Sequence, residues 1–500
     1  MVGWQNYKYY IHSGDHHVKL SELLDGIDYS YKGFDDLNGV TVLGIQDDSR
    51  QIKNGDLFVA VRGYSQDGHA FVEEAIKAGA VAIIAEEKIE LDVPCIVVSN
   101  SKQILGEIVG NFYKHPCLRK RIVGITGTNG KTTISYMLKH VLEKQGFKCG
   151  LIGTVEYVIN GKKLSSQNTT PGALQLQKMI HDSEDDVIII EVSSHALKQG
   201  RVNGIKFDLC LFTNLDGEHL DYHSDMEDYF ETKALLFEKL KSTGMAIVNL
   251  DDLWGEKLSR RLKKENVKVF SIGMSKDADL KIAERGSKVK FKSSKEFKLE
   301  LDLPGIYNKY NAVFTIMASH LWSLHIEKTI NYLSNFKKVP GRFEIFHFPG
   351  NKTVVVDYAH TAKGFYYCLN AIRECGAYRI FHVFGFRGNR DPYKRPEMIK
   401  MSYELSDYYI LTFDDLNEIE PVEMERELLA FHSRYNNESG EVITDRTIAI
   451  KRAIDMASDG DWVVITGKGH EEYRHDFEMQ TTSDIDTVKK LLHEYSYVKE

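Results

Sequence analysis

The sequence predicts an α/β protein of three domains. Short apolar runs, typical of buried strands, alternate with amphipathic helical stretches through almost the whole chain, and this alternation favours mostly parallel sheets. With 500 residues, the chain is long enough for several domains at roughly 100–200 residues each. Two polar segments that carry charge and proline, 113–124 and 333–344, interrupt the alternation. We therefore place the domains at residues 1–119, 120–338 and 339–500.

The expected elements follow from these patterns. The apolar runs predicted as strands are Val81–Ala85, Ile122–Thr126, Val187–Val192, Leu209–Thr213, Thr353–Asp357, Ile380–Phe384, Tyr408–Thr412 and Trp462–Thr466. The helical patterns are Ala70–Lys77, Thr132–Gln145, Thr361–Glu374 and Asp445–Met456. Residues 1–17 precede the first clear helix and form an extension. Its paired histidines, His16 and His17, could bind metal, but a polar, solvated arm is the stronger interpretation.

Composition narrows the class of protein. Hydrophobic residues make up 42% of the chain and charged residues 27%, which suits a large folded core. The formal net charge of −8 argues against a nucleic-acid partner. No stretch approaches the ~20 apolar residues of a membrane span, and no signal-peptide pattern begins the chain. We therefore expect a soluble, cytoplasmic protein without a membrane partner.

The six cysteines show no CxxC spacing, which favours reduced, buried thiols over a disulfide framework or a zinc site. They are Cys95, Cys117, Cys149, Cys210, Cys368 and Cys375.

The segment VGITGTNGKTTISYMLKHVLEKQGF, residues 123–147, indicates a phosphate-binding loop. A strand that stops at a glycine turn and continues as a helix presents backbone N–H groups and a helix N-terminus to an anion. Lys131 would reach the terminal phosphates and Thr132 would offer its hydroxyl to Mg²⁺. The general pattern has glycine where this chain has Ile125, so the match is to a variant, GTNGKTT. An ordinary glycine turn is the weaker alternative, and we predict an ATP-using enzyme.

Polar clusters follow several later strands. Glu191 ends a buried strand and could hold a metal ion beside the phosphate loop. Of His219 and His223, either could be a satisfied surface histidine, but their place after the next strand favours one of them as a ligand. Asn308 and Asn311 could hydrogen-bond a base or cap the following helix.

Two further clusters end strands of the third domain, with Asp357 and His360 in VVVDYAH and with residues 467–473 in GKGHEEY. Ligands of open α/β sheets collect at such strand ends.

These motifs together resemble the Mur ligases of peptidoglycan synthesis, and within them the MurE type. GTNGKTT is common to all Mur ligases and to folylpolyglutamate synthetase. The combination of DDSRQIKNGDLFVAVRGYSQDGHAF, NTTPGALQL, EVSSHALKQGRV and GKGHE is more specific. The resemblance runs from about Val18 to the last helix. It implies a UDP-binding N-terminal domain, a central P-loop ATPase domain and a C-terminal Rossmann-like domain that binds the amino acid.

The resemblance also implies roles at matching positions. ATP would be held by Gly127, Thr128, Asn129, Gly130, Lys131, Thr132, Thr133, Asn311, Arg342 and Asp357. Ser49 and Arg50 would contact the UDP part of UDP-N-acetylmuramoyl-L-alanyl-D-glutamate, and its muramoyl-dipeptide would be held by Thr169, Thr170, Ser193, Gln199 and Arg201. Mg²⁺ would bind Thr132, Glu191, His219 and Lys233, with Lys131, Lys233 and His219 as the catalytic residues. The incoming amino acid would be bound by Asp414, Asp415, Asn417, Gly467 and Glu471.

Lys233 matches the lysine that the family carbamylates. An ammonium repels Mg²⁺, whereas CO₂ added to a neutral amine gives a carboxylate that can bind it. Without the family pattern, a plain surface lysine on a helix would be the default interpretation.

The chemistry implied is amide formation. ATP phosphorylates the substrate carboxylate, and the amino group attacks the acyl phosphate. The third domain closes over the site to exclude water, with Pro340–Gly341 near the hinge. We expect the enzyme to be a monomer.

The amino-acid selector departs from the family pattern. Enzymes for meso-diaminopimelate carry Asp-Asn-Pro-Arg, in which the arginine grips the second carboxylate, but this chain has Asp414-Asp415-Leu416-Asn417. Because an added acid repels a carboxylate and attracts an ammonium, we predict L-lysine as the third amino acid. Two alternatives stay open: a MurE-like ligase that joins another amino acid or amine in a secondary pathway, and a non-catalytic binding protein that retains the ligase fold.

Overall fold

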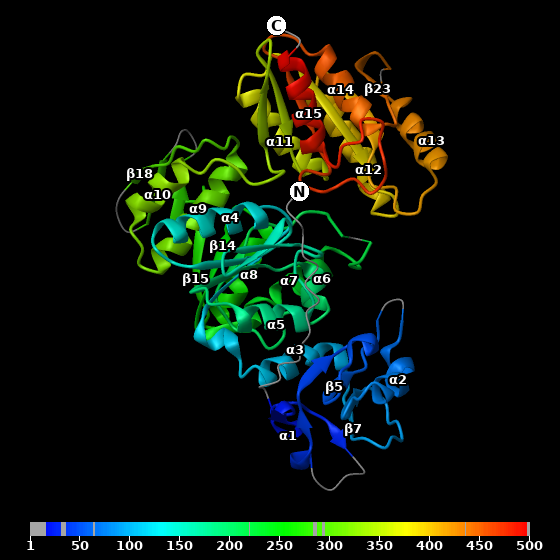
Figure 1. The fold of residues 1–500 in the computed structure, drawn as a ribbon. Helices are drawn as coiled ribbons and strands as arrows, with labels where there is room; N and C mark the ends of the chain where they lie inside the picture. The colour runs from blue at the N-terminus through cyan, green and yellow to red at the C-terminus, as the bar shows by residue number, and fades with distance from the viewer. Residues whose placement is uncertain are drawn as a thin grey trace.

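The computed structural model describes residues 17–31, 37–63, 66–219, 221–283, 288–292, 296–435 and 437–497. Three lobes follow one another along the chain, and each contains its own sheet (Figure 1). Residues 1–16, predicted as an extension with His16, lie outside the described residues. The domain limits near residues 119 and 338 stay predictions: residue 119 ends the 3₁₀ turn η4 (Pro116–Arg119) before strand β8 (Arg121–Thr126), and residue 338 precedes β19 (Glu344–Phe348).

The N-terminal lobe contains a five-stranded sheet in the order β2-β7-β6-β5-β4, parallel except for the edge strand β2. Its strands are β1 Val18–Lys19, β2 Ser30–Tyr31, β3 Thr41–Val42, β4 Gly44–Gln46, β5 Asp56–Val59, β6 Ala82–Ala85 and β7 Cys95–Val97. Its helices are α1 Leu20–Leu23, α2 Val72–Lys77 and α3 Ser101–Phe112, with short 3₁₀ turns that include η2 Ser49–Gln51. Helix α3 packs against the central lobe through α5 (Ala173–Asp182).

The central lobe is an eleven-stranded sheet in the order β11-β10-β9-β12-β8-β13-β14-β15-β16-β17-β18. The neighbours in the series β9-β12-β8-β13-β14-β15-β16 all pair in parallel. Antiparallel strands β10 and β11 extend one edge, and β17 and β18 extend the other. The remaining strands are β9 Cys149–Ile152, β10 Glu156–Ile159, β11 Lys162–Ser165, β12 Val187–Glu191, β13 Phe207–Phe212, β14 Leu240–Asn249, β15 Lys268–Gly273, β16 Leu280–Ile282, β17 Lys288–Phe291 and β18 Glu296–Lys298. Helices α4 Lys131–Lys144, α6 Ser194–Lys198, α7 Met226–Ala234, α8 Leu253–Lys264, α9 Ile306–Leu321 and α10 Ile326–Ser334 complete this lobe.

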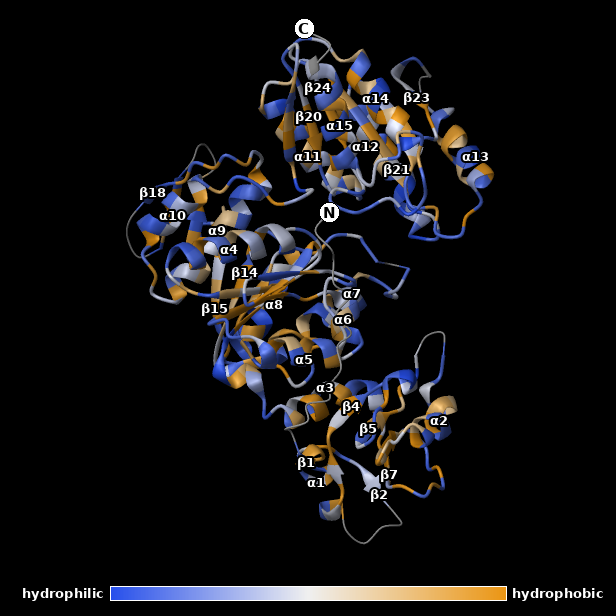
Figure 2. Ribbon diagram, viewed as in Figure 1, coloured by the Kyte–Doolittle hydropathy of each residue, from blue (hydrophilic) through white to orange (hydrophobic). Residues whose placement is uncertain are grey.

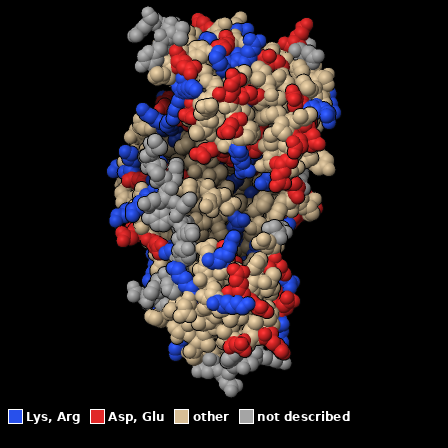
Figure 3. All heavy atoms as spheres, turned by 45° about the vertical axis from the view of Figure 1, so that its right-hand side comes forward, with Lys and Arg blue, Asp and Glu red and all other residues tan. Residues whose placement is uncertain are grey.

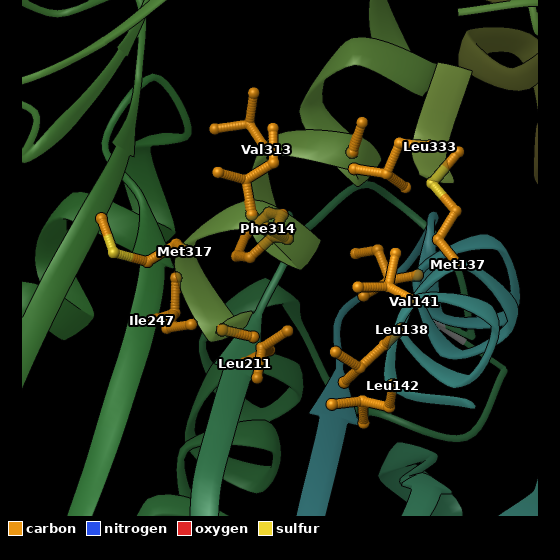
Figure 4. Close-up of a cluster of buried hydrophobic side chains, with 14 of the residues drawn as sticks. Met137, Leu138, Val141, Leu142, Leu211, Ile247, Val313, Phe314, Met317 and Leu333 are labelled. Atoms are coloured by element: carbon orange, nitrogen blue, oxygen red, sulfur yellow. The ribbon is translucent and has the colours of Figure 1, made fainter. Parts of the chain in front are cut away.

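The core that supports the phosphate loop lies between α4, α9 and the central strands. Side chains from α4, including Met137, Leu138 and Val141, meet Phe314 and Met317 of α9 in one buried cluster (Figure 4). The strands beneath them are apolar along most of their length, while polar residues lie mainly in loops and on outer helix faces (Figure 2). Because α4 begins at Lys131, this packing fixes the position of the helix N-terminus.

Replacing Leu138, which is fully buried, by alanine tests this support. We expect the central domain to lose about 2–5 kcal/mol of unfolding free energy, because the deleted atoms leave a cavity in packed surroundings. Urea unfolding followed by the fluorescence of Trp322, which packs against the same cluster, would measure it. Leu253→Ala is the matched control, since that side chain is 82% exposed on α8 and should change stability by less than about 0.5 kcal/mol. Equal effects of the two changes would contradict the packing argument.

The C-terminal lobe has a six-stranded sheet in the order β19-β20-β24-β21-β22-β23, with only β19 antiparallel. Its other strands are β20 Lys352–Val356, β21 Ile380–Phe386, β22 Tyr408–Phe413, β23 Gly440–Val442 and β24 Trp462–Ile465. Its helices are α11 Ala362–Glu374, α12 Arg395–Leu405, α13 Pro421–His432, α14 Arg446–Met456 and α15 Asp484–Tyr497. Helices lie on both faces of this sheet (Figure 1).

The predicted α/β class is confirmed, and the eight predicted strands are present within two residues at their ends. The edge hairpins β10–β11 and β17–β18 were not predicted, because strands of three or four residues carry a weak periodic signal. Of the six cysteines, Cys375 is exposed and Cys95 is only half-buried, so the expectation of six buried thiols is wrong for these two. In the described part of the chain, no helix is long and apolar enough to cross a membrane.

Candidate active site

The phosphate loop joins the end of β8 to the start of α4. Gly127 and Gly130 have φ angles of 138° and 89°, in the region that favours glycine. A Cβ atom at Gly127 would lie 1.9 Å from Thr213 Oγ1, and one at Gly130 would lie 2.6 Å from Asn311 Oδ1. Both positions therefore need glycine, for backbone angle and for space.

Lys131 bends back over this loop. Its Nζ donates hydrogen bonds to the backbone oxygens of Gly127 and Thr128, both at 2.8 Å. Burial lowers the pKa of Lys131. Asn129 is fixed through its backbone N–H, which donates to Asn214 Oδ1 at 2.9 Å. The loop is therefore held rigidly, with a cation over the anion-binding turn.

Thr132 and Glu191 come together at the end of β12. Thr132 Oγ1 donates to Glu191 Oε2 at 2.8 Å, and Thr154 Oγ1 donates to the same oxygen at 2.9 Å. Hydroxyl and carboxylate oxygens are hard ligands that fit Mg²⁺. Among the described residues, no group of three or more His, Cys, Asp and Glu side chains is arranged to hold a metal ion by itself. This donor set fits an ion that takes its other ligands from water and phosphate.

Lys233 lies inside the protein, on α7. Its Nζ donates to Gly127 O at 2.9 Å, the same oxygen that Lys131 contacts, and lies 4.5 Å from the centre of the Tyr229 ring. Only 1% of the residue is exposed, so the interpretation as a plain surface lysine is wrong. Burial, with a smaller contribution from Lys131, holds the pKa of Lys233 well below its usual value.

The two candidate histidines have different surroundings. His223 is buried and bonded on both ring nitrogens, with Nε2 3.0 Å from Ser194 Oγ and Nδ1 3.3 Å from Asp228 Oδ2. His219 lines the central cavity, and burial lowers its pKa to about 4. Of the two, His219 is the one that lines the cavity, and its role as a metal ligand stays a prediction; both ring nitrogens of His223 are occupied by neighbours in the protein.

Residues of the C-terminal lobe reach the loop from the opposite side. Arg342 Nη2 donates to Thr132 Oγ1 at 3.4 Å, and its guanidinium lies 3.9 Å from the centre of the Tyr358 ring. Asp357 accepts backbone N–H groups from Phe343 and Ala359, both at 2.7 Å. The side chain of Arg342 thus approaches the phosphate loop across the gap between two lobes.

Asn308 and Asn311 lie within α9 rather than at its cap, which is Gly305. The helix-cap interpretation of these asparagines is therefore wrong. Asn308 Nδ2 donates to Pro304 O at 2.7 Å, and both asparagines line the same cavity as Lys131.

A cavity of about 450 Å³ lies between the central and C-terminal lobes. The phosphate loop, His219, Arg342, Asp357 and Arg390 are among its lining residues. On the face shown in Figure 3, Lys and Arg side chains are interspersed with Asp and Glu rather than gathered into one basic surface. The cavity itself is lined by cations that include Lys131, Arg342 and Arg390.

Two contacts that the sequence analysis missed bridge the same lobes. His360 Nε2 lies 2.6 Å from Glu218 Oε1, and Lys363 pairs with Asp216. Both pairs join the loop after β13 to the start of α11, and only the tertiary structure brings these segments together. They lie where the third domain was expected to close.

Three family models match the chain: Mur ligase family, catalytic domain, over residues 41–113; Mur ligase middle domain over 125–319; and Mur ligase, glutamate ligase domain, over 341–469. A UDP-N-acetylmuramoyl-L-alanyl-D-glutamate–2,6-diaminopimelate ligase from Clostridium botulinum is 38% identical over 474 residues, 91% of this chain and 95% of that protein. The chain belongs to the Mur ligase family. Members of this family are ATP-dependent, ADP-forming ligases, and this chain is an enzyme of that type.

Solved structures agree with this assignment. A structure of a UDP-N-acetylmuramoyl-L-alanyl-D-glutamate–2,6-diaminopimelate ligase matches with a TM-score of 0.68 at 27% identity, covering 96% of this chain and 99% of that one. The MurF ligase from Thermotoga maritima in complex with ADP matches with a TM-score of 0.63 at 20% identity, covering 91% and 98%. The second likeness supports the fold alone.

The residues predicted to hold the muramoyl-dipeptide cluster beside Glu191 in this ligase. Thr170 Oγ1 donates to Glu191 O at 2.7 Å, and Arg201 Nη1 donates to Thr170 O at 2.8 Å. Arg201 also donates to Gln199 Oε1, at 3.1 and 2.8 Å. Thr169 and Ser193 line the central cavity.

Ser49 and Arg50 lie apart from that cavity, on η2 of the N-terminal lobe. Arg50 is 82% exposed and pairs with Asp48 at 2.9 Å, and this hydrogen bond lowers the pKa of Asp48 to about 2. Their predicted contact with UDP would therefore lie at the far end of a long substrate.

The predicted amino-acid site is formed by two facing loops of the C-terminal lobe, after β22 and after β24. Asp414 and Asp415 are only 2% and 3% exposed, and Lys468 Nζ lies 2.6 Å from Asp415 Oδ1 and 3.6 Å from Asp414 Oδ1. Burial by itself would raise the pKa of Asp414, but Arg387 and Lys468 outweigh it and lower the pKa to about 2. Gly467 must be glycine, because its φ is 109° and a Cβ would lie 2.8 Å from Asp414 Oδ2.

This arrangement corrects the argument used to predict L-lysine. The two acids are neutralised inside the protein, so they do not present a free negative charge to an incoming amino acid. Arg387, which the sequence analysis passed over, pairs with Glu471, and Tyr358 Oη donates to Glu471 Oε1 at 2.9 Å. A basic residue three positions after the predicted strand 380–384 is the signal that could have found it.

Proposed function

We propose that this ligase binds ATP at the loop of residues 127–133 and couples a diamino acid to UDP-N-acetylmuramoyl-L-alanyl-D-glutamate. The observation that carries the proposal is the convergence at Gly127 O, where Lys131 and Lys233 both donate hydrogen bonds beside Thr132 and Glu191. The Lys131 ammonium over the anion-binding turn is suited to the phosphates of a nucleotide, and the oxygens of Thr132 and Glu191 are suited to the metal ion that accompanies them.

The reaction proceeds in two balanced steps. A carboxylate oxygen of the glutamate attacks the γ-phosphorus of ATP, ADP leaves, and an acyl phosphate forms. The neutral amino group of the incoming amino acid then attacks the acyl carbon, inorganic phosphate leaves, and the nitrogen loses a proton. Lys131 stabilises charge on the phosphates, while Arg342 and the pairs Glu218–His360 and Asp216–Lys363 keep the lobes together and water out.

Mg²⁺, held by Thr132 and Glu191, would screen the charge of the nucleotide phosphates. Lys233 is placed to extend this ligand set as a carbamate: its neutral amine adds CO₂ and releases one proton. Its burial beside the loop supports this assignment. His219 would lie at the edge of the same site.

The proposed amino acid is meso-diaminopimelate. The relatives that match over nine-tenths of the chain carry that substrate in their names, and the internal pairing of Asp414 and Asp415 removes the charge argument against it. L-Lysine is the second candidate, because Asn417 stands where the family's diaminopimelate enzymes have arginine. The catalytic residues are present, which disfavours a non-catalytic binding protein.

A substrate screen tests the proposal. The purified protein, ATP, Mg²⁺ and the UDP-muramoyl-dipeptide would be incubated with meso-diaminopimelate, L-lysine, L-ornithine or no amino acid, and phosphate release and product mass would be followed. We expect phosphate release to depend on both the dipeptide and the amino acid, with diaminopimelate giving the highest kcat/KM. Omission of the dipeptide is the control.

Two outcomes would change the assignment. If only a different amine supports turnover, the ligase serves another pathway, and the proposed substrate is wrong. If no acceptor supports phosphate release although the protein binds ATP, the proposed reaction itself is wrong.

A further inference from the structure

Arg474 lies at the rim of the amino-acid site, seven residues after Gly467 in the loop that follows β24. Its Nη1 donates a hydrogen bond to Asn417 Oδ1 at 3.0 Å, and its Nε lies 3.5 Å from Asp415 Oδ2. The side chain is 71% exposed, in contrast to the buried cation Lys468 behind it. Arg474 therefore presents a guanidinium to solvent at the place where the two loops meet.

Asn417 holds this arginine in position. Its Nδ2 donates to Gly388 O at 3.0 Å, and Asn389 Nδ2 donates to Asn417 O at 2.6 Å, so the asparagine is fixed from both ends. With the amide nitrogen turned towards Gly388, the amide oxygen faces Arg474. Asn417 has a φ of 43°, a conformation that asparagine tolerates better than most residues.

Three buried or half-buried acids of the two loops are paired within the protein. Lys468 neutralises Asp415, and Arg387 contacts both Glu471 and, at 3.8 Å, Asp414. Asp415 is 3% exposed and already pairs with Lys468. Its electrostatic attraction for the more distant Arg474 is therefore partly cancelled. Arg474 is therefore an exposed cation held at this rim by Asn417.

We propose that Arg474 recognises a carboxylate at the far end of the incoming amino acid and so makes the site selective for a diamino dicarboxylic acid. The inference rests on the proposed function and deepens it. A guanidinium has five N–H donors and can bind a carboxylate through two parallel hydrogen bonds while one donor remains on Asn417. The same cation repels the ammonium at the end of a lysine side chain. Arg474 thus supplies, from the opposite loop, the positive charge that Asn417 lacks.

Steady-state kinetics of Arg474→Ala with each amino acid test this. We expect the KM for meso-diaminopimelate to rise by at least about tenfold, with kcat changed less, because the lost contact is made in the ground state as well as the transition state. The KM for L-lysine should stay the same or fall. Arg474→Lys should recover only part of the effect, since an ammonium cannot form the two parallel bonds. Arg434→Ala is the matched control and should leave both constants unchanged, because this exposed arginine lies over the Phe431 ring at the end of α13.

A double variant separates recognition from general electrostatics. Asn417→Arg in the Arg474→Ala background moves the guanidinium to the facing loop, and we expect it to restore a low KM for diaminopimelate. The inference is overturned if Arg474→Ala leaves the KM for diaminopimelate unchanged, or if the wild-type protein prefers L-lysine.

The kinetics distinguish an error in the role of Arg474 from an error in the proposed reaction. Phosphate release that depends on diaminopimelate but is insensitive to Arg474→Ala overturns only the role of Arg474. A wild-type protein that releases no phosphate with any acceptor overturns the proposed reaction and this inference together. Equal melting temperatures of the variants would show that any change in KM is not caused by unfolding.

Discussion

Lys131→Ala should reduce kcat by about 100- to 1,000-fold, which corresponds to about 2.7–4 kcal/mol of lost transition-state stabilisation. The reason is the position of this side chain: its Nζ lies over the loop, 2.8 Å from the oxygens of Gly127 and Thr128, where nucleotide phosphates would gather. Without it, charge that develops on the transferred phosphoryl group has no cation held in place beside it. Phosphate release under saturating dipeptide and amino acid would measure the loss, and isothermal titration with ADP would measure the change in nucleotide affinity.

Lys144→Ala is the matched control for this variant. Lys144 ends the same helix, is exposed, and lies more than three turns from the loop. We expect it to retain wild-type kinetics. Near-normal activity in Lys131→Ala would contradict the assignment of residues 127–133 as the nucleotide site, whatever the behaviour of the control.

Lys233→Ala should also reduce turnover by at least about 100-fold, because it removes the group proposed to complete the metal site as a carbamate. The side chain is 1% exposed and bonds to Gly127 O at 2.9 Å, so its loss acts at the centre of the site. Short carboxylates such as formate or acetate should restore part of the activity, since they can occupy the space of the missing carbamate. The variant should also need more Mg²⁺ for ADP binding, which calorimetry would detect without turnover.

Lys257→Ala controls for the loss of a lysine near α7. Lys257 lies on the outside of the protein, where it pairs with Glu227 and contacts the Phe230 ring at 4.7 Å. That variant should keep its activity and gain nothing from formate. If Lys233→Ala retains full activity, or if ¹³C-labelled CO₂ gives no carbamate signal in the wild-type protein, the carbamate assignment is wrong.

The local chemistry of the phosphate loop could be read from the sequence because its parts are contiguous. An apolar strand, two glycines with positive φ, and a helix that starts at Lys131 lie within a single run of residues, and each obeys a local rule. The same holds for Glu191, because its place at the end of an apolar strand predicts that it lies at the carboxyl ends of the parallel strands.

The sequence gives a less reliable prediction where charges interact across loops. Asp414 and Asp415 look like free acids in the linear sequence, and the L-lysine prediction followed from that view. In the folded protein, Lys468 and Arg387, from loops that follow other strands, pair with these acids, and Arg474 is an exposed cation beside them. Net charge at a site depends on pairs that are distant in sequence, so composition near one motif cannot predict it.

By itself, the amino-acid sequence determined the alternation of strands and helices, the phosphate-binding turn and the family to which the chain belongs, because these depend on periodicity and on short contiguous motifs. Only the tertiary structure decided that Lys233 is buried, that both ring nitrogens of His223 are occupied, and that Glu218 and His360 join two lobes. Burial and pairing are properties of neighbours brought together by packing, and a residue's neighbours in space are not those beside it in the chain.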